Sequence, residues 1–233
     1  KSPTANELTD YSKAVGQLKR YERNAIKLFW ANCFNIATDG MKSVYGATYS
    51  PAQYFLYWRD EELEEKLEGN LEMTIFSLLQ KERLLDIVSN FIVFEQTKEG
   101  KVKKICRYQQ LRATNKIVER VKNKRDKRGL IWHTQGSGKS LTMFFTAWKL
   151  RFDNELQNPK VFILVDRIDL DTQISDTFVN CGGENVVRIT SRDDLEKKIM
   201  NNDRGIFIST IQKFSELPSD LYNQNENIIV LSD

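Results

Sequence analysis

One short stretch, GLIWHTQGSGKSLTM at residues 129–143, limits the possible folds more than any other part of this sequence. Its core, from His133 to Ser140, matches the phosphate-binding pattern G-x-x-x-x-G-K-[ST] except that His133 stands in place of the first glycine. Apolar residues 130–132 precede the glycines, and an amphipathic helical pattern follows them. A strand that enters a glycine turn and leaves as a helix points backbone N–H groups at phosphates. The stretch therefore predicts a strand at 130–132 and a nucleotide-binding loop in an α/β fold.

The glycine and polar residues of this loop are of the types that phosphate and Mg²⁺ binding require. Gly136 and Gly138 permit a tight approach of the backbone, Lys139 reaches the β and γ phosphates, and the Ser140 hydroxyl suits Mg²⁺. His133 needs only to enter the turn, so we interpret it as structural. The predicted ATP-contacting residues of the loop are Gln135, Gly136, Ser137, Gly138, Lys139 and Ser140.

Apolar runs in the C-terminal part indicate a parallel sheet. VFILV (161–165), IFIST (206–210) and IIVLS (228–232) are short and rich in β-branched or aromatic residues, and helical patterns separate them. Buried strands spaced in this way favour crossover helices on a parallel sheet. Ser191, followed by Asp193 and Asp194, predicts a helix start, because a serine caps free N–H groups and acidic residues suit a helix N-terminus.

The N-terminal part has a mixed pattern. A helical repeat covers roughly residues 5–25, and a β-rich stretch follows at 28–46, where Asp39-Gly40 is typical of a hairpin turn. Residues 53–90, rich in Glu, Lys and Leu, indicate helices that bridge two units. We therefore expect an α+β N-terminal piece and an α/β C-terminal piece.

Composition and charge exclude several classes of protein. No apolar run approaches the roughly 18 residues of a membrane span, and three scattered cysteines with one histidine make neither a zinc site nor a disulfide framework. We expect a cytoplasmic protein without a membrane partner. Residues 98–128 contain 13 Lys and Arg against three acidic residues, a net charge of +10. This density fits contact with a phosphate backbone, but it equally fits a solvated helix face.

HTQGSGKS is similar to the loop of one group of superfamily-two motors, the restriction (R, or HsdR) subunits of type I restriction–modification enzymes. The upstream ICRYQQLRA resembles the adenine-reading motif of these motors. The resemblance implies that Gln110 holds the adenine edge, with Arg107 and Gln109 as support. A polar start to a basic helix explains each of these residues equally well.

Two further segments extend the resemblance downstream. VDRIDLDTQ, with Asp166, Arg167, Asp169, Leu170 and Gln173, resembles the second helicase motif, and STIQKF resembles the next. The family pattern implies DNA contacts by Arg167, Thr210 and Lys213 at the ends of strands. In IIVLSD, Asp233 resembles the first acidic residue of a Walker B motif, which would hold Mg²⁺ opposite Ser140.

The N-terminus carries weaker marks of the same family. Gln17 and Tyr21 lie four residues apart on one helix face, as in the accessory motif of RecB-like nuclease domains. Lys1, in the opening KSP, resembles the lysine of the nuclease core. The resemblance implies catalytic roles for Lys1, Gln17 and Tyr21, with metal-binding acidic residues upstream of this chain.

Together these patterns predict a RecA-like P-loop parallel sheet with crossover helices, preceded by the α+β tail of a RecB-like nuclease domain. The predicted boundaries are 1–58 for the nuclease part, 59–95 for a helical connector and 96–233 for the first motor lobe. We expect a fragment, inactive alone, of an ATP- and Mg²⁺-dependent double-stranded DNA translocase and endonuclease whose partners are methyltransferase and specificity subunits. The alternatives are a superfamily-two helicase or remodeller without nuclease activity, a small-molecule phosphotransferase, and a non-catalytic DNA-binding module. DNA-stimulated ATPase activity distinguishes the motor from the phosphotransferase, and loss of activity in Lys139→Ala distinguishes it from the DNA-binding module.

Overall fold

A computed structural model describes residues 11–59, 69–97, 100–123, 126–166, 176–181, 186–215, 217–218, 221, 223 and 225–233. Contacts divide the chain into two compact units, Lys1–Leu111 (unit 1) and Arg112–Asp233 (unit 2). Residues 96–111 thus fall in unit 1, although the sequence assigns them to the motor lobe. The domain boundaries at 58/59 and 95/96 remain a prediction.

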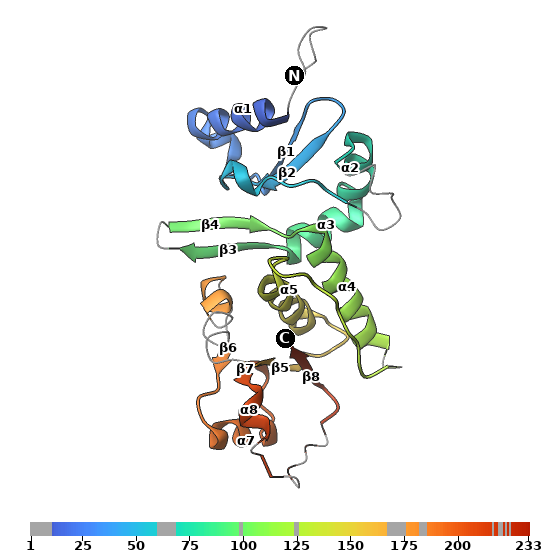
Figure 1. Cartoon of the computed structure of the whole chain (residues 1–233), viewed down its shortest axis with the longest axis vertical. Helices are drawn as coiled ribbons and strands as arrows, with labels where there is room; N and C mark the ends of the chain where they lie inside the picture. Colours follow the sequence, from blue (N-terminus) through green and yellow to red (C-terminus); the bar gives the residue numbers. More distant parts are fainter. Residues whose placement is uncertain are drawn as a thin grey trace. The chain divides into compact units, whose positions relative to one another are not determined.

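Unit 1 combines helices with two antiparallel hairpins (Figure 1). Its elements are α1 (Tyr11–Asn24), η1 (Ile26–Phe29), β1 (Phe34–Thr38), β2 (Ser43–Ala47), η2 (Ala52–Tyr54), α2 (Leu71–Leu78), α3 (Lys81–Asn90), β3 (Ile92–Thr97), β4 (Gly100–Ile105) and the start of α4 (Tyr108–Asn123). The expected α+β character of this part is confirmed, although residues 60–68 of the acidic stretch lie outside the described residues.

The β1–β2 hairpin forms where the sequence predicts it. One carboxylate oxygen of Asp39 accepts the backbone N–H groups of Met41 (2.9 Å) and Lys42 (2.7 Å). Gly40 has φ of 97°, a left-handed conformation that glycine adopts without strain. Asp39 therefore stabilises the turn as a hydrogen-bond acceptor, and Gly40 allows the left-handed backbone conformation that the turn needs.

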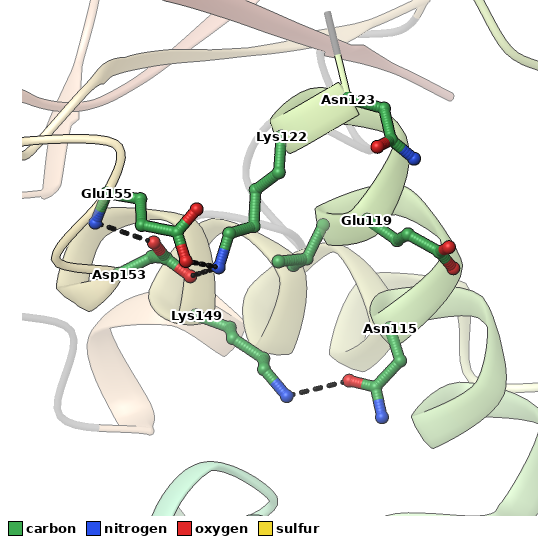
Figure 2. Close-up of a pocket in the computed structure, with 8 residues that line it drawn as sticks. Asn115, Glu119, Lys122, Asn123, Lys149, Asp153 and Glu155 are labelled. Atoms are coloured by element: carbon green, nitrogen blue, oxygen red, sulfur yellow. Dashed lines mark hydrogen bonds and ion pairs between the residues drawn. The ribbon is translucent and has the colours of Figure 1, made fainter.

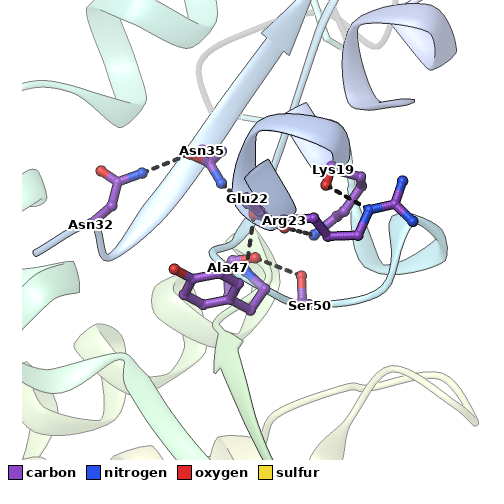
Figure 3. Close-up of polar contacts among 8 residues, drawn as sticks. Lys19, Glu22, Arg23, Asn32, Asn35, Ala47 and Ser50 are labelled. Carbon is purple, nitrogen blue, oxygen red and sulfur yellow. Dashed lines mark hydrogen bonds and ion pairs between the residues drawn. The ribbon is translucent and has the colours of Figure 1, made fainter. Parts of the chain in front are cut away.

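A buried carboxylate ties α1 to this hairpin (Figure 3). Glu22 is buried, and its Oε1 accepts from the Asn35 side-chain amide (2.9 Å) and from the Tyr49 backbone N–H (3.0 Å). Lys19 donates to the other oxygen at 2.6 Å. Tyr49 has φ of 67°, which is costly for an aromatic residue. The hydrogen bond that the Tyr49 N–H donates to Glu22 helps to hold this conformation. Glu22 thus links α1 to β1 and to the segment after β2 within unit 1.

The β3–β4 hairpin was not predicted from the sequence. Its strands pair in register from Ile92 with Ile105 to Thr97 with Gly100. Three basic residues of the run 98–128 therefore lie on β4 (Lys101, Lys103 and Lys104), and four lie on α4 (Arg112, Lys116, Arg120 and Lys122). Several of these lysines already have protein partners: Lys103 donates to the Asn32 carbonyl at 2.8 Å, and Lys104 pairs with Glu95.

Unit 2 contains a four-stranded sheet of order β6-β7-β5-β8, in which all neighbours are parallel. Its elements are α5 (Lys139–Phe152), β5 (Lys160–Val165), β6 (Val186–Arg188), α7 (Arg192–Met200), β7 (Gly205–Thr210), α8 (Ile211–Ser215) and β8 (Ile228–Ser232). Figure 1 shows the sheet edge-on, with α5 on one side and α7 and α8 on the other. The predicted parallel sheet with crossover helices is confirmed.

Each face of this sheet has its own apolar contacts. Phe162 and Phe207 pack with Ile189 and Leu195 in one buried cluster. A second cluster joins α4 and α5 through Val118, Leu150 and Leu156. The start of α7 is as predicted, because the Ser191 hydroxyl accepts the Asp194 N–H at 3.2 Å.

The prediction of a strand at residues 130–132 is wrong. These residues have no regular secondary structure, and the side chains of Leu130 and Trp132 are 89% and 87% exposed. A strand needs a neighbour to accept its backbone hydrogen bonds, and no described strand pairs with this segment.

Within the described part of the chain, none of the helices is long and apolar enough to cross a bilayer.

Candidate phosphate-binding site

The loop before α5 uses two glycines in the left-handed region. Gly136 has φ of 75°, and Gly138, the N-cap of α5, has φ of 86°. A Cβ placed on Gly136 would meet no heavy atom within 4 Å. The backbone conformation, rather than space, thus requires glycine at position 136. The sequence predicted both glycines for a close approach of the backbone to phosphates, and the left-handed conformation is a finding of the structure.

The N-terminus of α5 is open to an anion. Gly138 offers no side-chain cap, and the Thr142 N–H bonds to the Gly138 carbonyl at 3.1 Å. Helix geometry leaves the N–H groups of Lys139, Ser140 and Leu141 without an intrahelical acceptor. These N–H groups lie at the positive end of a 14-residue helix. Such an end binds phosphate through oriented N–H groups.

Lys139 and Asp233 meet at this helix end. The Lys139 ammonium lies 3.5 Å from a carboxylate oxygen of Asp233. The Asp233 backbone N–H donates to the Leu164 carbonyl at 3.0 Å, which holds Asp233 just beyond β8 and beside β5. The fold therefore brings together two residues that are far apart in sequence, one from the loop and one from the end of a strand.

The chain's single histidine lies at the loop entry. Burial lowers the pKa of His133, and the positive charge of Lys139 lowers it further. A lowered pKa keeps the imidazole neutral at neutral pH. His133 therefore adds no positive charge to the loop, and the structural role that the sequence predicts for it remains a prediction.

Other predicted site residues lie at the carboxyl edge of the sheet or outside the described residues. Thr210 is buried at the end of β7, and the Lys213 ammonium donates to the Ile189 carbonyl at 2.6 Å. The Gln212 amide donates to the Asp166 carbonyl at 2.7 Å, which joins the loops after β5 and β7. Outside the described residues lie Arg167, Asp169, Leu170 and Gln173. DNA contacts by Arg167, Thr210 and Lys213 remain predictions.

The predicted adenine-reading residues belong to unit 1. The Gln110 side-chain oxygen accepts the Arg107 backbone N–H at 2.8 Å, and Gln110 is buried. This bond caps the start of α4. Because the loop belongs to unit 2, the role of Gln110 and Arg107 at a nucleotide stays a prediction.

The nuclease motif is only partly described. Gln17 donates through its amide to the Tyr21 hydroxyl on α1, so the two residues share a helix face as predicted. Lys1 lies outside the described residues. The described residues contain no cluster of three His, Cys, Asp or Glu side chains placed to hold a metal. Catalytic roles for Lys1, Gln17 and Tyr21 remain predictions.

A charged hollow between α4 and α5 was not predicted. It has a volume of about 540 Å³, and Figure 2 shows Lys122 from α4 reaching toward Asp153 and Glu155 at the end of α5. Lys122 lies 2.9 Å from Asp153 and 2.7 Å from Glu155. Lys149 donates to Asn115 at 2.7 Å. These pairs join residues some 30 positions apart, which no local pattern reveals.

The pairing of Asp153 predicts a pH dependence of stability. Burial raises the pKa of Asp153, but hydrogen bonds from Lys122 and from the Glu155 and Leu156 N–H groups outweigh it, and the net pKa is lowered. A carboxyl with a lowered folded-state pKa stabilises the fold fully above its ordinary pKa of 3.8. That contribution is lost as the pH falls through the folded-state pKa.

We therefore expect Asp153→Asn to reduce the loss of stability on acidification below about pH 4. The difference should stay under about 1 kcal/mol, because the pair is partly solvated. Urea unfolding of the parent and the variant at several pH values between about 5 and 2.5 measures it. Parallel pH profiles of the two proteins would contradict the assignment.

Comparisons with other proteins identify the family of this chain. Residues 109–233 match the family described as SWI2/SNF2 ATPase. The HindI endonuclease subunit of a type I restriction enzyme from Haemophilus influenzae is 35% identical over 97% of this chain and 23% of its own length. The MjaVIIIP endonuclease subunit from Methanocaldococcus jannaschii, a putative type I restriction enzyme subunit, is 34% identical over 91% of this chain and 22% of its own.

The chain thus spans about a quarter of the length of these relatives. Among solved structures, that of T4 UvsW aligns with 65% of this chain and 28% of its own. The sequence identity is 18% and the TM-score 0.44. This likeness is too low to carry an inference.

Proposed function

This chain belongs to the SWI2/SNF2 ATPase family, and we propose that it forms part of an ATP-driven motor on double-stranded DNA. The relatives described above are endonuclease subunits of type I restriction enzymes. The observation that carries the proposal is the meeting of Lys139 with Asp233 at the open N-terminus of α5. A lysine and an acidic residue at this position suit a nucleotide triphosphate with its metal ion.

The residues of the loop fit ATP and Mg²⁺ by their chemistry. The N–H groups at the start of α5 and the Lys139 ammonium supply positive charge for phosphate oxygens. The Ser140 hydroxyl and the Asp233 carboxylate are oxygen donors of the kind that Mg²⁺ prefers. Bound ATP would supply the phosphoanhydride bond whose hydrolysis drives movement. Gln110 and Arg107 are our candidates for the adenine end.

We further propose that the intact protein uses this motor to translocate DNA and then cleave it. Support comes from the relatives, whose names identify them as restriction endonuclease subunits. On this proposal Arg167, Thr210 and Lys213 contact the DNA backbone, and Lys1, Gln17 and Tyr21 flank a nuclease site. Methyltransferase and specificity subunits are the proposed partners, and the cytoplasm, where the DNA lies, is the proposed setting.

A motor without nuclease activity is the second candidate. It is favoured by the match of residues 109–233 to the SWI2/SNF2 ATPase family. Magnesium-dependent cleavage of a long duplex by the intact protein with ATP and its partner subunits separates the two candidates.

The test of the motor itself is ATP hydrolysis by the intact protein with and without duplex DNA. We expect duplex DNA to raise the rate by about tenfold or more, because a translocase couples hydrolysis to its track. Single-stranded DNA and RNA of equal nucleotide concentration serve as controls for a helicase of another substrate class. A rate that responds to a small phosphate acceptor, and not to DNA, would exclude the motor.

A further inference from the structure

Three large apolar side chains are exposed together at the end of α1. Ile26, Leu28 and Trp30 fall within five consecutive residues, in η1 and directly after it, and they are 52%, 73% and 71% exposed. The side chain of Phe29, in the same segment, is buried. Isolated exposed apolar residues are ordinary, but a group of large ones indicates a site of interaction. One side chain thus anchors η1 in unit 1, and three face solvent.

Tyr49, in the segment after β2, fixes η1 in place. Its hydroxyl donates to the Ile26 carbonyl at 3.2 Å, and its ring centre lies 6.4 Å from that of Phe29 in an edge-to-face contact. Tyr49 has a φ of 67°, and the buried Glu22 carboxylate accepts its backbone N–H at 3.0 Å. A costly backbone conformation persists where neighbouring groups enforce it, and such positions are frequent at binding sites. The exposed side chains of η1 therefore stand on a preformed support, which lowers the entropic cost of binding.

The charge around these apolar side chains is positive. Arg23, in the last turn of α1, and Lys27, within η1, are exposed, and neither forms an ion pair with a described residue. Residues 20–59 contain two acidic side chains, Glu22 and Asp39. Glu22 is buried, and the Asp39 carboxylate accepts N–H groups of its own hairpin turn. An occupant of this surface meets cations whose acidic neighbours in the sequence are already engaged, which favours a negatively charged partner.

The apolar side chains favour a protein over a nucleic acid as this partner. A nucleic-acid strand binds such a surface by stacking its bases on aromatic rings. Trp30 offers a ring of this kind, but Ile26 and Leu28 do not. Apolar side chains bordered by charged ones are typical of protein–protein interfaces, which have an apolar core and a polar rim. An amphipathic helix that carries acidic residues beside its apolar face matches both features.

We propose that Arg23, Ile26, Lys27, Leu28 and Trp30, the η1 face, form a docking site for an amphipathic helix of a partner protein whose apolar face is bordered by carboxylates. The apolar face of that helix covers Ile26, Leu28 and Trp30, and its carboxylates pair with Arg23 and Lys27. The η1 face belongs to unit 1, whereas the loop before α5 belongs to unit 2. It therefore adds a binding function separate from the nucleotide site.

The probe for this site is a synthetic amphipathic peptide with leucine and phenylalanine on one helix face and glutamate on the other. Fluorescence anisotropy of the labelled peptide with the full chain measures its affinity. We expect saturable binding that Trp30→Ser weakens by about tenfold, because central aromatic residues dominate interface affinity. We expect Lys27→Gln to weaken binding by about threefold and to reduce its dependence on salt concentration. Thermal midpoints equal to that of the parent would show that both variants keep the fold.

Phe76→Ser and Lys81→Gln are the matched controls. Phe76 lies on α2 of the same unit and is 71% exposed, like Trp30, and Lys81 is an exposed cation at the start of α3. Both variants should bind the peptide within about twofold of the parent. A second peptide has lysine in place of each glutamate, and a third has serine in place of each apolar residue. Each should bind at least about tenfold more weakly than the first peptide.

The outcomes decide between occupants of the η1 face. Absence of binding by the acidic peptide, or equal losses in Trp30→Ser and Phe76→Ser, overturns the docking site. Equal affinity for the lysine peptide overturns the acidic partner. Single-stranded DNA is the last probe: if it binds more tightly than the acidic peptide and Trp30→Ser weakens it, the surface takes nucleic acid and the proposed protein partner is wrong. Nucleotide binding by Lys139→Ala does not enter these results, so this inference and the proposed function fail separately.

Discussion

Replacing Lys139 with alanine is expected to lower DNA-stimulated ATP hydrolysis by the intact protein at least about 100-fold. Lys139 is the first residue of α5 and half-exposed, and it carries the positive charge nearest to the open helix end. Charge develops on the transferring phosphate, and a preorganised cation stabilises it more strongly than water does. The loss should therefore affect the maximal rate as well as nucleotide affinity.

Lys149→Ala provides the matched control for this experiment. Lys149 belongs to the same helix and carries the same charge, but its ammonium donates to Asn115 in the hollow between α4 and α5. Its removal changes the net charge equally without touching the loop. We expect a rate within about twofold of the parent and a small change in stability. Equal losses in both variants would indicate a general effect of charge or folding and would remove Lys139 from the site.

Local patterns predicted the features that depend on nearby residues. The Asp39-Gly40 turn, the Ser191 cap and the left-handed glycines of the loop each follow from the chemistry of a few adjacent positions. Three apolar runs became β5, β7 and β8, because each is long enough to be a strand and is flanked by helical patterns. The helix predicted after the loop is also present, from Lys139 to Phe152.

Features that depend on distant partners were missed. Residues 130–132 have the composition of a strand, yet a strand also requires a neighbouring backbone, and composition does not supply one. In β4, strand pairing with β3 prevails over a sequence that reads as a solvated basic run. The family resemblance placed Asp233 opposite Ser140 at a metal ion, whereas the contact between Asp233 and Lys139 depends on the parallel order of β5 and β8, which no local pattern contains.

Lys160 stands at the start of an apolar run, where a lysine is typical of a solvated strand end, so the sequence did not predict its burial. In the structure it is fully buried at the start of β5. Its ammonium donates to the carbonyls of Lys198 (2.5 Å), Ile199 (3.2 Å) and Asn201 (2.6 Å) at the C-terminus of α7. One cation thus satisfies three carbonyls where the helix dipole is negative.

Replacing Lys160 with methionine is therefore expected to destabilise unit 2 by about 3 kcal/mol. Methionine fills a similar volume, so the loss comes from the carbonyls of Lys198 and Asn201, which lose this donor, and from that of Ile199, which keeps only the Asn223 amide. Burial lowers the pKa of Lys160, while the charge of Asp203 acts in the opposite direction. The cost of desolvating the ammonium thus offsets part of its three hydrogen bonds, which keeps the expected loss below their sum.

Lys197→Met is the control, because Lys197 is an exposed cation in the last turn of the same helix. Its loss removes a similar interaction with the helix dipole but leaves no buried carbonyl unpaired, so we expect a change within about 0.5 kcal/mol. Denaturant unfolding of the parent and both variants, followed by circular dichroism, gives the comparison. A Lys160→Met variant as stable as the parent would mean that water or a shift of α7 satisfies these carbonyls. The buried ammonium would then contribute nothing to the joint between β5 and α7.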